Sequence, residues 1–254
     1  MIQLSKVFAG YGQAPILQDI TLTISAGSVT TLIGPNGCGK TTLLRVIAGQ
    51  LPYTEGSVSL FGKDVSQYDR KALARKVAML PQSRDIPSLA VEALVRHGRY
   101  PHLGFSRRLT KADEAIVAKA MEQADVADLA PRELKTLSGG QRQRAYLAMA
   151  LAQDTDVILL DEPATHLDLN RQFELLELIR SLKDAGKTIL LVLHDLDHAL
   201  RYSDRLILLQ EGRLVQTGTP RELLGSGHLE QVFGIGIREC ADGFLFTYQK
   251  KNSL

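Results

Sequence analysis

Hydrophobic and polar residues alternate in two segments near the N-terminus, which predicts strands that bury only one face. In residues 18–24 (QDITLTI) every second side chain is apolar, and in residues 55–61 Val58 and Leu60 stand between polar neighbours. Alternation with a period of two is typical of antiparallel strands with one face in solvent. We therefore expect an antiparallel β-subdomain in this part of the chain.

Continuous apolar segments, in contrast, predict strands that are buried on both faces. They occur at residues 29–33, 76–80, 157–160, 189–193 and 206–209. A parallel sheet that is covered by helices on both sides produces this pattern. The segments therefore indicate an α/β core.

Three helices are predicted within this core, the first over residues 41–47 (TTLLRVI). An amphipathic helix ends near Gly186, and its apolar positions recur at helical spacing, namely at Phe173, Leu176, Ile179 and Leu182. A short helix is expected to begin at Thr219, because Pro220 suits the first helical position and Glu222 completes a capping box.

Residues 87–150 interrupt the core with a segment that we predict to be helical throughout. Thr110 and Asp113 have the spacing of a capping box. Apolar residues then follow at helical spacing, at Ile116, Ala120 and Ala124. The segment is therefore expected to form a helical subdomain inserted into the core.

Length and composition suit one large domain over residues 1–254. In it, residues 1–86 and 151–254 form the α/β core with its β-subdomain, and residues 87–150 form the helical subdomain. Hydrophobic residues make up 44% of the chain and charged residues 23%, which excludes intrinsic disorder. Lys and Arg number 30 and Asp and Glu 28, and a net charge of +2 does not by itself indicate a nucleic-acid partner.

Two cysteines, Cys38 and Cys240, stand far apart in the sequence. This spacing does not fit a disulfide framework or a zinc site, and it favours a reducing, intracellular compartment. The N-terminus (MIQLSKVFAG) does not have the pattern of a signal peptide. A membrane helix needs about 20 apolar residues, and the longest apolar runs, at residues 157–160 and 189–193, are far shorter. We therefore expect any work at a membrane to depend on a partner.

The clearest chemical motif is GPNGCGKT at residues 34–41, which matches G-x-x-x-x-G-K-[ST] in full. Glycines permit positive φ angles, so successive backbone N–H groups can point at phosphate oxygens. Lys40 would bring a positive charge to the β- and γ-phosphates, and the Thr41 hydroxyl can bind Mg²⁺. A chance glycine turn is the alternative, and the flanking strand and helix disfavour it. The expected nucleotide-binding residues are Gly34, Pro35, Asn36, Gly37, Cys38, Gly39, Lys40, Thr41 and Thr42.

Two acidic residues, Asp161 and Glu162, come directly after the predicted strand at residues 157–160. A carboxylate at the carboxyl end of a parallel strand lies where ligands of such sheets bind. Asp161 would hold Mg²⁺ through oxygen, and Glu162 would polarise the attacking water as a general base. An acidic turn without a catalytic role is the alternative, and the phosphate loop upstream favours the catalytic interpretation.

The sequence LSGGQ at residues 137–141 is the most informative segment. As an ordinary helix start, Ser138 and Gln141 form a capping box. A cap does not need two glycines, however, each of which costs roughly 1 kcal/mol inside a helix. Gly139 and Gly140 are explained if an anion approaches the backbone at this helix N-terminus.

Together these motifs resemble those of the ATPase subunit of ATP-binding-cassette (ABC) transporters, over nearly the whole chain. The resemblance implies a P-loop NTPase (RecA-like) core with an N-terminal antiparallel β-subdomain and an inserted α-helical subdomain. It implies hydrolysis of ATP with Mg²⁺ as the metal. The implied catalytic residues are Glu162, His194 and Lys40, and the implied Mg²⁺ ligands are Thr41, Gln82 and Asp161.

Four further residues match family motifs by their order and spacing. Gln82 matches the Q-loop glutamine, which contacts the metal and couples to the permease, and His194 matches the switch histidine, which reaches the γ-phosphate. Asp168 matches the D-loop aspartate, and Tyr11 matches the aromatic residue that stacks on adenine. Taken singly, each has an ordinary explanation as a turn, core or surface residue.

The D-loop at residues 164–168 (ATHLD) departs from the commoner Ser-Ala-Leu-Asp wording. Thr165 and His166 stand in its middle. We interpret this departure as family variation. It leaves the assignment of Asp168 intact and puts communication between the two nucleotide sites in doubt.

The resemblance also implies a homodimer with ATP at its interface. Residues 138–141 lie on the helical insertion, from which they cannot easily reach the phosphate loop of their own chain. In the family, two subunits associate head to tail, so that the phosphate loop of one and the LSGGQ of the other enclose each ATP. Hydrolysis reopens the dimer, and this motion passes to membrane permease subunits near Gln82. A substrate-binding protein acts through the permease, and the ATPase lies at the cytoplasmic face of the inner or plasma membrane.

The segment GRYPH at residues 98–102 resembles the iron-chelate importer group. HDLDHALRY at residues 194–202 and Gly218-Thr219-Pro220 are consistent with this group. We therefore expect uptake of a ferric siderophore, with haem or cobalamin as the alternative cargo. A helix end that turns at Pro101 explains the segment without any role in transport.

Two other classes of protein share a nucleotide-binding cassette with the transporter ATPases. A soluble ABC ATPase that acts on nucleic acid or the ribosome usually has two cassettes, long coiled coils or a zinc insertion, none of which the sequence indicates. The basic pair Arg107 and Arg108 is typical of a solvated face, so no nucleic-acid partner is expected. A regulator that does not hydrolyse ATP should lack Glu162 or His194, and both are present.

Overall fold

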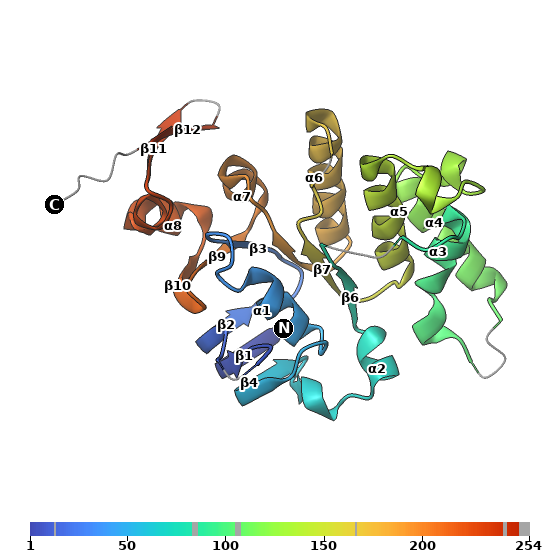
Figure 1. Ribbon diagram of the computed structural model, residues 1–254, viewed down its shortest axis with the longest axis horizontal. Coiled ribbons are helices and arrows are strands. Elements are labelled where there is room, and N and C mark those ends of the chain that lie inside the picture. Colours follow the sequence, from blue (N-terminus) through green and yellow to red (C-terminus); the bar gives the residue numbers. More distant parts are fainter. Residues whose placement is uncertain (13, 83–85, 105–107, 166, 241–242, 249–254) are drawn as a thin grey trace. The chain divides into compact units, whose positions relative to one another are not determined.

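The computed structural model describes residues 1–12, 14–82, 86–104, 108–165, 167–240 and 243–248. They form two compact units, Met1–Ser66 with Leu190–Leu254 and Gln67–Ile189. Figure 1 labels most of their helices and strands. The second unit contains residues 87–150 together with neighbouring strands and helices.

An antiparallel sheet in the first unit confirms the predicted β-subdomain. Its strands are β1 (Ile2–Ala9), β2 (Leu17–Ile24), β4 (Tyr53–Leu60) and β5 (Lys63–Asp64). They lie in the order β2-β1-β4-β5. Leu4 of β1 stands opposite Leu22 on one side and Val58 on the other, and all three are buried. The period-two pattern thus places one row of apolar side chains in the core.

The remaining core elements of the first unit are β3 (Val29–Ile33), α1 (Lys40–Ile47), α7 (Leu196–Tyr202), β9 (Arg205–Gln210), β10 (Arg213–Gly218), α8 (Pro220–Ser226) and α9 (His228–Phe233). β3 pairs in parallel with β9, which pairs antiparallel with β10. Every residue of β3 is buried, as its continuous apolar sequence predicts. α8 begins with the predicted capping box, in which the Glu222 N–H donates to the Thr219 hydroxyl at 3.3 Å.

The structure contains a C-terminal hairpin that we do not predict from the sequence. It consists of β11 (Ile235–Cys240) and β12 (Gly243–Tyr248), paired antiparallel. The described side chains of β11 are half-buried or exposed, and Leu245 of β12 is 50% exposed. Apolar residues recur there at a period of two, at Ile235, Ile237, Phe244 and Phe246, but these side chains are only half-buried.

The second unit contains the parallel pair β6 (Val77–Leu80) and β7 (Val157–Asp161), with Val77 opposite Val157. β8 (Thr188–Val192) crosses the division between the units and is fully buried. The helices are α2 (Arg70–Ala74), α3 (Val91–His97), α4 (Lys111–Gln123), α5 (Gly139–Ala152) and α6 (Leu169–Asp184). The 3₁₀ turns are η1 (Val65–Gln67), η2 (Tyr100–His102), η3 (Ala127–Leu129) and η4 (Leu134–Thr136).

Two sequence predictions need correction in this unit. Residues 87–150 are not helical throughout, because irregular segments separate α3, α4 and α5. Pro101 and Gly104 lie in one of these segments, where they disfavour a continuous helix. In α6 the buried face consists of Leu175, Leu176, Ile179 and Leu182. Phe173, which we expected on that face, is 42% exposed.

The helical part of this unit, α3 to α5, contains a buried ion pair. Arg99 follows α3 and donates from Nε to Asp113 Oδ1 of α4 at 3.0 Å and from Nη1 to the Ala152 carbonyl of α5 at 2.9 Å. Asp113 also completes the predicted capping box with Thr110. Hydrogen bonds from the Thr110 hydroxyl and N–H, together with the Arg99 guanidinium, lower the pKa of Asp113 to about 2. One carboxylate thus anchors the start of α4 to its neighbours.

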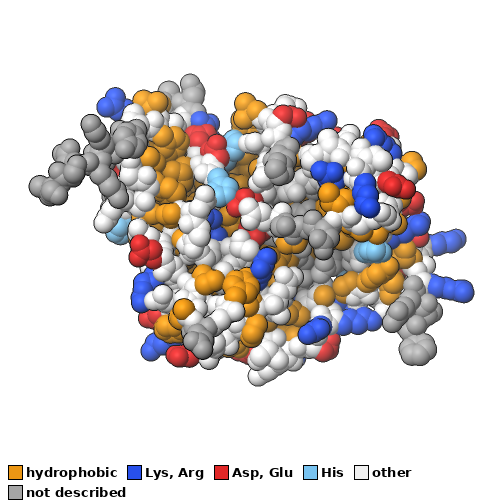
Figure 2. Space-filling model, in the orientation of Figure 1, with side chains coloured by type: hydrophobic (Ala, Val, Ile, Leu, Met, Phe, Trp, Pro, Cys, Tyr) orange, Lys and Arg blue, Asp and Glu red, His pale blue; other side chains and the backbone are white. Residues whose placement is uncertain are grey.

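Basic side chains project from the outer edge of the helical part, at the right of Figure 2. Of the basic pair expected on a solvated face, Arg108 is exposed, and Arg107 lies outside the described residues. The exposure of Arg108, which precedes α4, agrees with the solvated face that we expected.

Candidate functional site

The phosphate-loop motif lies in the first unit, between the end of β3 and the start of α1. Gly34, Gly37 and Gly39 have φ angles of 147°, 76° and 104°. The Lys40 side chain lies within the loop, where Nζ donates to the Gly34 carbonyl at 2.8 Å and to the Pro35 carbonyl at 3.0 Å. The loop that is predicted to bind an anion therefore already holds an ammonium group.

The other residues of the loop differ in exposure. Asn36 and Gly37 form an exposed tip, whereas Cys38 is buried. Burial raises the pKa of the Cys38 thiol, against the opposing effect of the Lys40 charge. Cys38 therefore stays protonated at neutral pH and packs as an apolar side chain. Thr41 and Thr42 follow in the first turn of α1.

Replacing Gly34 by Ala is expected to destabilise this loop strongly. An added Cβ would lie 2.1 Å from the Leu209 carbonyl oxygen and 2.8 Å from Cys38 Sγ. Overpacking of this kind costs about 3 kcal/mol. Gly37→Ala is the matched control, because a Cβ there meets nothing within 4 Å, and we expect about 1 kcal/mol from its positive φ alone. Urea unfolding measures both; equal losses would contradict the close approach at Gly34.

Tyr11 is 56% exposed and contacts a residue that the motifs did not single out. Arg45 of α1 donates from Nη1 to the Tyr11 hydroxyl at 2.7 Å, and its guanidinium carbon lies 5.8 Å from the ring centroid. This contact restrains the ring while leaving much of it open to a planar ligand. No sequence signal links the two residues, because only the fold brings them together.

His194 lies in the first unit between β8 and α7 and is exposed. The next residue, Asp195, is the N-cap of α7, and its carboxylate accepts from the His198 N–H at 3.0 Å. The histidine therefore follows the end of a strand, as predicted.

The acidic pair lies in the second unit. Asp161 is the last residue of β7 and is fully buried. Glu162 follows with φ 52°, a left-handed conformation that is uncommon for a residue other than glycine. Its Oε2 accepts from Gln82 Nε2 at 2.7 Å and from the Thr165 hydroxyl at 3.4 Å. The fold thus joins two predicted site residues, and strained residues of this kind cluster at functional sites.

Gln143 is a further residue near the acidic pair that sequence reasoning missed. It lies on α5, and its Nε2 donates to the Pro163 carbonyl at 3.0 Å. This bond ties the helix that starts with LSGGQ to the segment that follows Glu162. Its position in that helix is the only sequence signal.

Ser138 is the N-cap of α5, and the expected capping box is present. The Gln141 N–H donates to the Ser138 hydroxyl at 3.3 Å, and Gln141 Oε1 accepts from the Ser138 N–H at 3.1 Å. Gly139 and Gly140 form the first turn, half-buried. The ordinary helix-start interpretation therefore holds in this structure, and it does not account for the two glycines.

A hollow of about 660 Å³ opens beside this helix start. It is lined by Ser138, Gly139, Gly140, Gln141, Arg142, Arg144, Leu167, Asp168 and Arg171. Asp168 is the N-cap of α6 and accepts from the Arg171 N–H at 3.0 Å. The hollow thus brings the D-loop aspartate together with LSGGQ, and arginines around a helix N-terminus favour an anion. His166 of the D-loop lies outside the described residues.

Comparison with known proteins yields the following matches. The family described as ABC transporter matches residues 17–165. The iron(3+)-hydroxamate import ATP-binding protein FhuC of Bacillus subtilis is 45% identical, over 92% of this chain and 87% of the relative. The ferric enterobactin transport ATP-binding protein FepC of Escherichia coli is 43% identical, over 89% and 84%. The hemin import ATP-binding protein HmuV of Streptomyces coelicolor is 43% identical, over 87% and 79%. A dimeric structure of the bacterial ABC transporter cassette MJ0796 covers 87% of this chain and 99% of its own, with a TM-score of 0.79 and 26% identity.

Proposed function

The chain belongs to the ABC transporter family as an ATP-hydrolysing cassette, and from this premise we propose that it energises the uptake of a ferric siderophore. The observation that carries the cargo is the identity of 45% and 43% to two proteins named for iron(3+)-hydroxamate and ferric enterobactin. The GRYPH segment at residues 98–102 supports the same group.

The phosphate loop is proposed to bind ATP through Gly34 to Thr42, with Lys40 on the β- and γ-phosphates and Tyr11 stacked on adenine. The positive φ angles of the loop and the position of Lys40 support this role. The donor set fits Mg²⁺, a hard cation that prefers oxygen: the buried Asp161 carboxylate, the Thr41 hydroxyl and the Gln82 amide oxygen. The ion neutralises phosphate charge when it is bound.

Hydrolysis is assigned to Glu162 as general base, with His194 at the γ-phosphate. Glu162 needs to face an incoming water, and its hydrogen bond from Gln82 holds the carboxylate in one orientation. Two copies associate so that Ser138, Gly139, Gly140 and Gln141 of one contact the nucleotide of the other. The arginine-lined hollow beside Asp168 supports an anion there.

Membrane permease subunits and a substrate-binding protein are the proposed partners. Within the described residues, no helix is both long and apolar enough to cross a membrane. We propose attachment through a permease at the cytoplasmic face because the chain is similar to import ATP-binding proteins. We further propose that residues 1–86 and 151–254 form the core and that residues 87–150 form the helical subdomain.

Cells that lack this chain are expected to lose uptake of radioactive ferric siderophore. The native chain should restore it, whereas Lys40→Ala should not, because the loop then has no ammonium group for the phosphates. Lys63→Ala, which changes an exposed lysine of β5, is the matched control and should restore uptake. Normal siderophore uptake in the deleted cells, with no second ATPase present, would overturn the cargo.

The same experiment separates the alternatives. The hemin importer at 43% identity favours haem as the second candidate cargo, so haem and cobalamin uptake are followed in parallel. Loss of either alone reassigns the cargo. A soluble factor for nucleic acid or ribosomes predicts normal uptake of all three and sedimentation away from membranes.

A further inference from the structure

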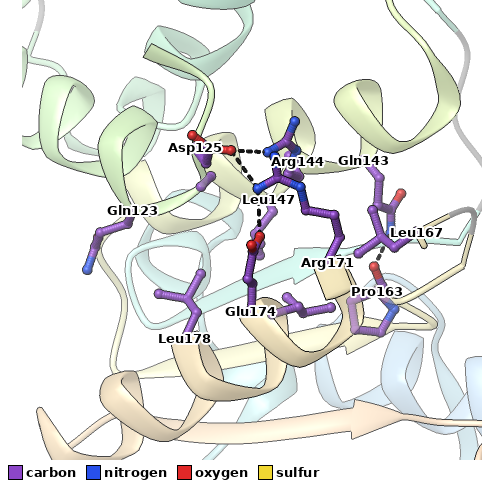
Figure 3. A pocket seen from close by; sticks show the side chains of 12 residues that line it. Gln123, Asp125, Gln143, Arg144, Leu147, Pro163, Leu167, Arg171, Glu174 and Leu178 are labelled. Carbon is purple, nitrogen blue, oxygen red and sulfur yellow. Dashed lines mark hydrogen bonds and ion pairs between the residues drawn. The ribbon is translucent and has the colours of Figure 1, made fainter. Parts of the chain in front are cut away.

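Asp125, immediately after α4, joins two arginines from different helices (Figure 3). Its Oδ2 accepts hydrogen bonds from Nη1 of Arg144, on α5, and from Nη1 of Arg171, on α6, the latter at 2.9 Å. None of the three residues belongs to the sequence motifs. One carboxylate therefore links the helix that begins with LSGGQ to the helix that begins at the D-loop aspartate.

Arg171 is held at both ends. Its backbone N–H donates to Asp168 Oδ1 at 3.0 Å, and its Nη1 pairs with Glu174 Oε2 at 2.6 Å as well as with Asp125. Arg171 therefore connects the Asp125 carboxylate, through its side chain, to the N-cap residue Asp168 of α6, through its backbone. Asp168 in turn lines the hollow that Ser138 faces.

Arg144 makes the equivalent link on the other side. It lies in the second turn of α5, which has Ser138 as its N-cap. Its side chain lines the same hollow. Its side chain is only 17% exposed, against 66% for Asp125. The carboxylate thus reaches from the surface to a largely covered guanidinium.

The backbone does not explain why an aspartate occupies this position. Asp125 has φ 51°, and its N–H donates to the Glu122 carbonyl at 3.0 Å in the turn that ends α4. Glycine or asparagine adopts this left-handed conformation at least as easily. The negative charge therefore serves the two arginines rather than the turn.

We propose that Asp125 is a positioning residue for ATP hydrolysis: by holding Arg144 and Arg171, it fixes Ser138 and Asp168 in the arrangement that receives the γ-phosphate from a second copy of the chain. The inference rests on the proposed function, in which two copies enclose ATP. Without the carboxylate, two guanidinium groups separate, and the helix starts lose their common anchor.

The test compares Asp125→Asn with Asp128→Asn in the full chain. Asparagine keeps the size and the left-handed preference of residue 125, and Asp128 is an exposed aspartate of η3 that loses the same charge. In a Glu162→Gln background, dimerisation by ATP is followed by sedimentation. Asp125→Asn should raise the ATP concentration at half-dimerisation about tenfold, which corresponds to roughly 1.4 kcal/mol. Asp128→Asn should leave it unchanged.

Three further readouts separate positioning from stability. With Glu162 intact, Asp125→Asn should lower kcat several-fold and raise KM for ATP in parallel with the ATP concentration at half-dimerisation, while ATP binding by the monomer stays unchanged. Arg171→Gln should also lower turnover, and the double variant should lose less than the sum of the two single losses, because both substitutions remove the Asp125–Arg171 contact. High salt should lower native turnover towards that of Asp125→Asn, because salt screens the partly exposed ion pairs of Asp125 with Arg144 and Arg171.

The outcomes are distinct. Equal behaviour of Asp125→Asn and Asp128→Asn, or additive losses with Arg171→Gln, overturns the positioning role and leaves the ATPase proposal in place. A Glu162→Gln chain that does not dimerise with ATP overturns the ATP-bridged dimer, and the positioning role with it. A fall in Tm that accounts for the whole loss of turnover makes Asp125 structural only, which also overturns the proposal.

Discussion

Glu162→Gln is expected to lower ATP turnover by at least about a hundredfold, the usual effect of removing a general base. Glutamine keeps the length and the hydrogen-bonding capacity of the side chain but cannot accept the proton of the attacking water. ATP binding should persist, because the phosphate loop, its Lys40 contacts and the Tyr11–Arg45 pair lie on the first unit and do not include Glu162.

The experiment measures phosphate release and ATP affinity on the same preparations. Glu177→Gln is the matched control, an exposed glutamate on α6 that pairs with Arg180 in an i,i+3 contact. It should show native turnover. Retention of native turnover by Glu162→Gln would remove Glu162 from the mechanism, whereas joint loss of binding and turnover would mean that the variant disturbs the fold at its strained φ of 52°.

The second large effect is expected in stability. Arg99→Met should lower the free energy of unfolding by about 3–5 kcal/mol, as the loss of one partner from a buried ion pair does. The Arg99 and Asp113 side chains are only 6% and 12% exposed. Methionine fills much of the same space, but it leaves the Asp113 carboxylate and the Ala152 carbonyl without the guanidinium that now contacts both.

Arg96→Met is the control for Arg99→Met. Arg96 lies one turn earlier, near the end of α3, and pairs with Glu92 and Glu114 in contacts about 40% exposed. Exposed pairs contribute at most about 1 kcal/mol. In urea unfolding, the loss in the free energy of unfolding should therefore be several times larger for Arg99→Met than for Arg96→Met. Similar losses from both would show that Arg99 contributes no more than a surface pair.

The pH dependence of this difference has a defined sign. In the folded chain the pKa of Asp113 is about 2, below its value in the unfolded chain of about 4. A lowered pKa stabilises the fold fully above pH 4, and this contribution is lost as the pH falls towards 2. The gap between the native chain and Arg99→Met should therefore narrow between pH 5 and pH 2.5, and a constant gap would contradict the role of the Asp113 charge.

The contacts of Glu162 with Gln82 and of Arg99 with Ala152 join residues that are far apart in the sequence. The features that local sequence determined are those with short-range causes. The phosphate loop, the capping boxes of α4, α5 and α8, and the buried strands β3, β7 and β8 follow from residues within a few positions of one another. Glycine φ angles, side-chain caps and apolar periodicity all act over that range.

The tertiary structure alone decided which of these features meet. Gln82 and Glu162 lie 80 positions apart and share a hydrogen bond, and Asp125 is 46 positions from Arg171. Arg45 reaches Tyr11 across 34 positions. No periodicity or cap encodes such pairs, because their distance depends on how helices and strands pack.

The failed predictions have the same cause. Phe173 satisfies the helical spacing of α6 yet is exposed, because the packing of that helix places Leu175 rather than Phe173 on the inner face. The hairpin of β11 and β12 has apolar residues at a period of two, Ile235 and Ile237 in one strand and Phe244 and Phe246 in the other, yet these side chains are only half-buried. The sequence by itself therefore determined the elements and the chemistry of the motifs, whereas side-chain packing over long separations decided the contacts that orient them.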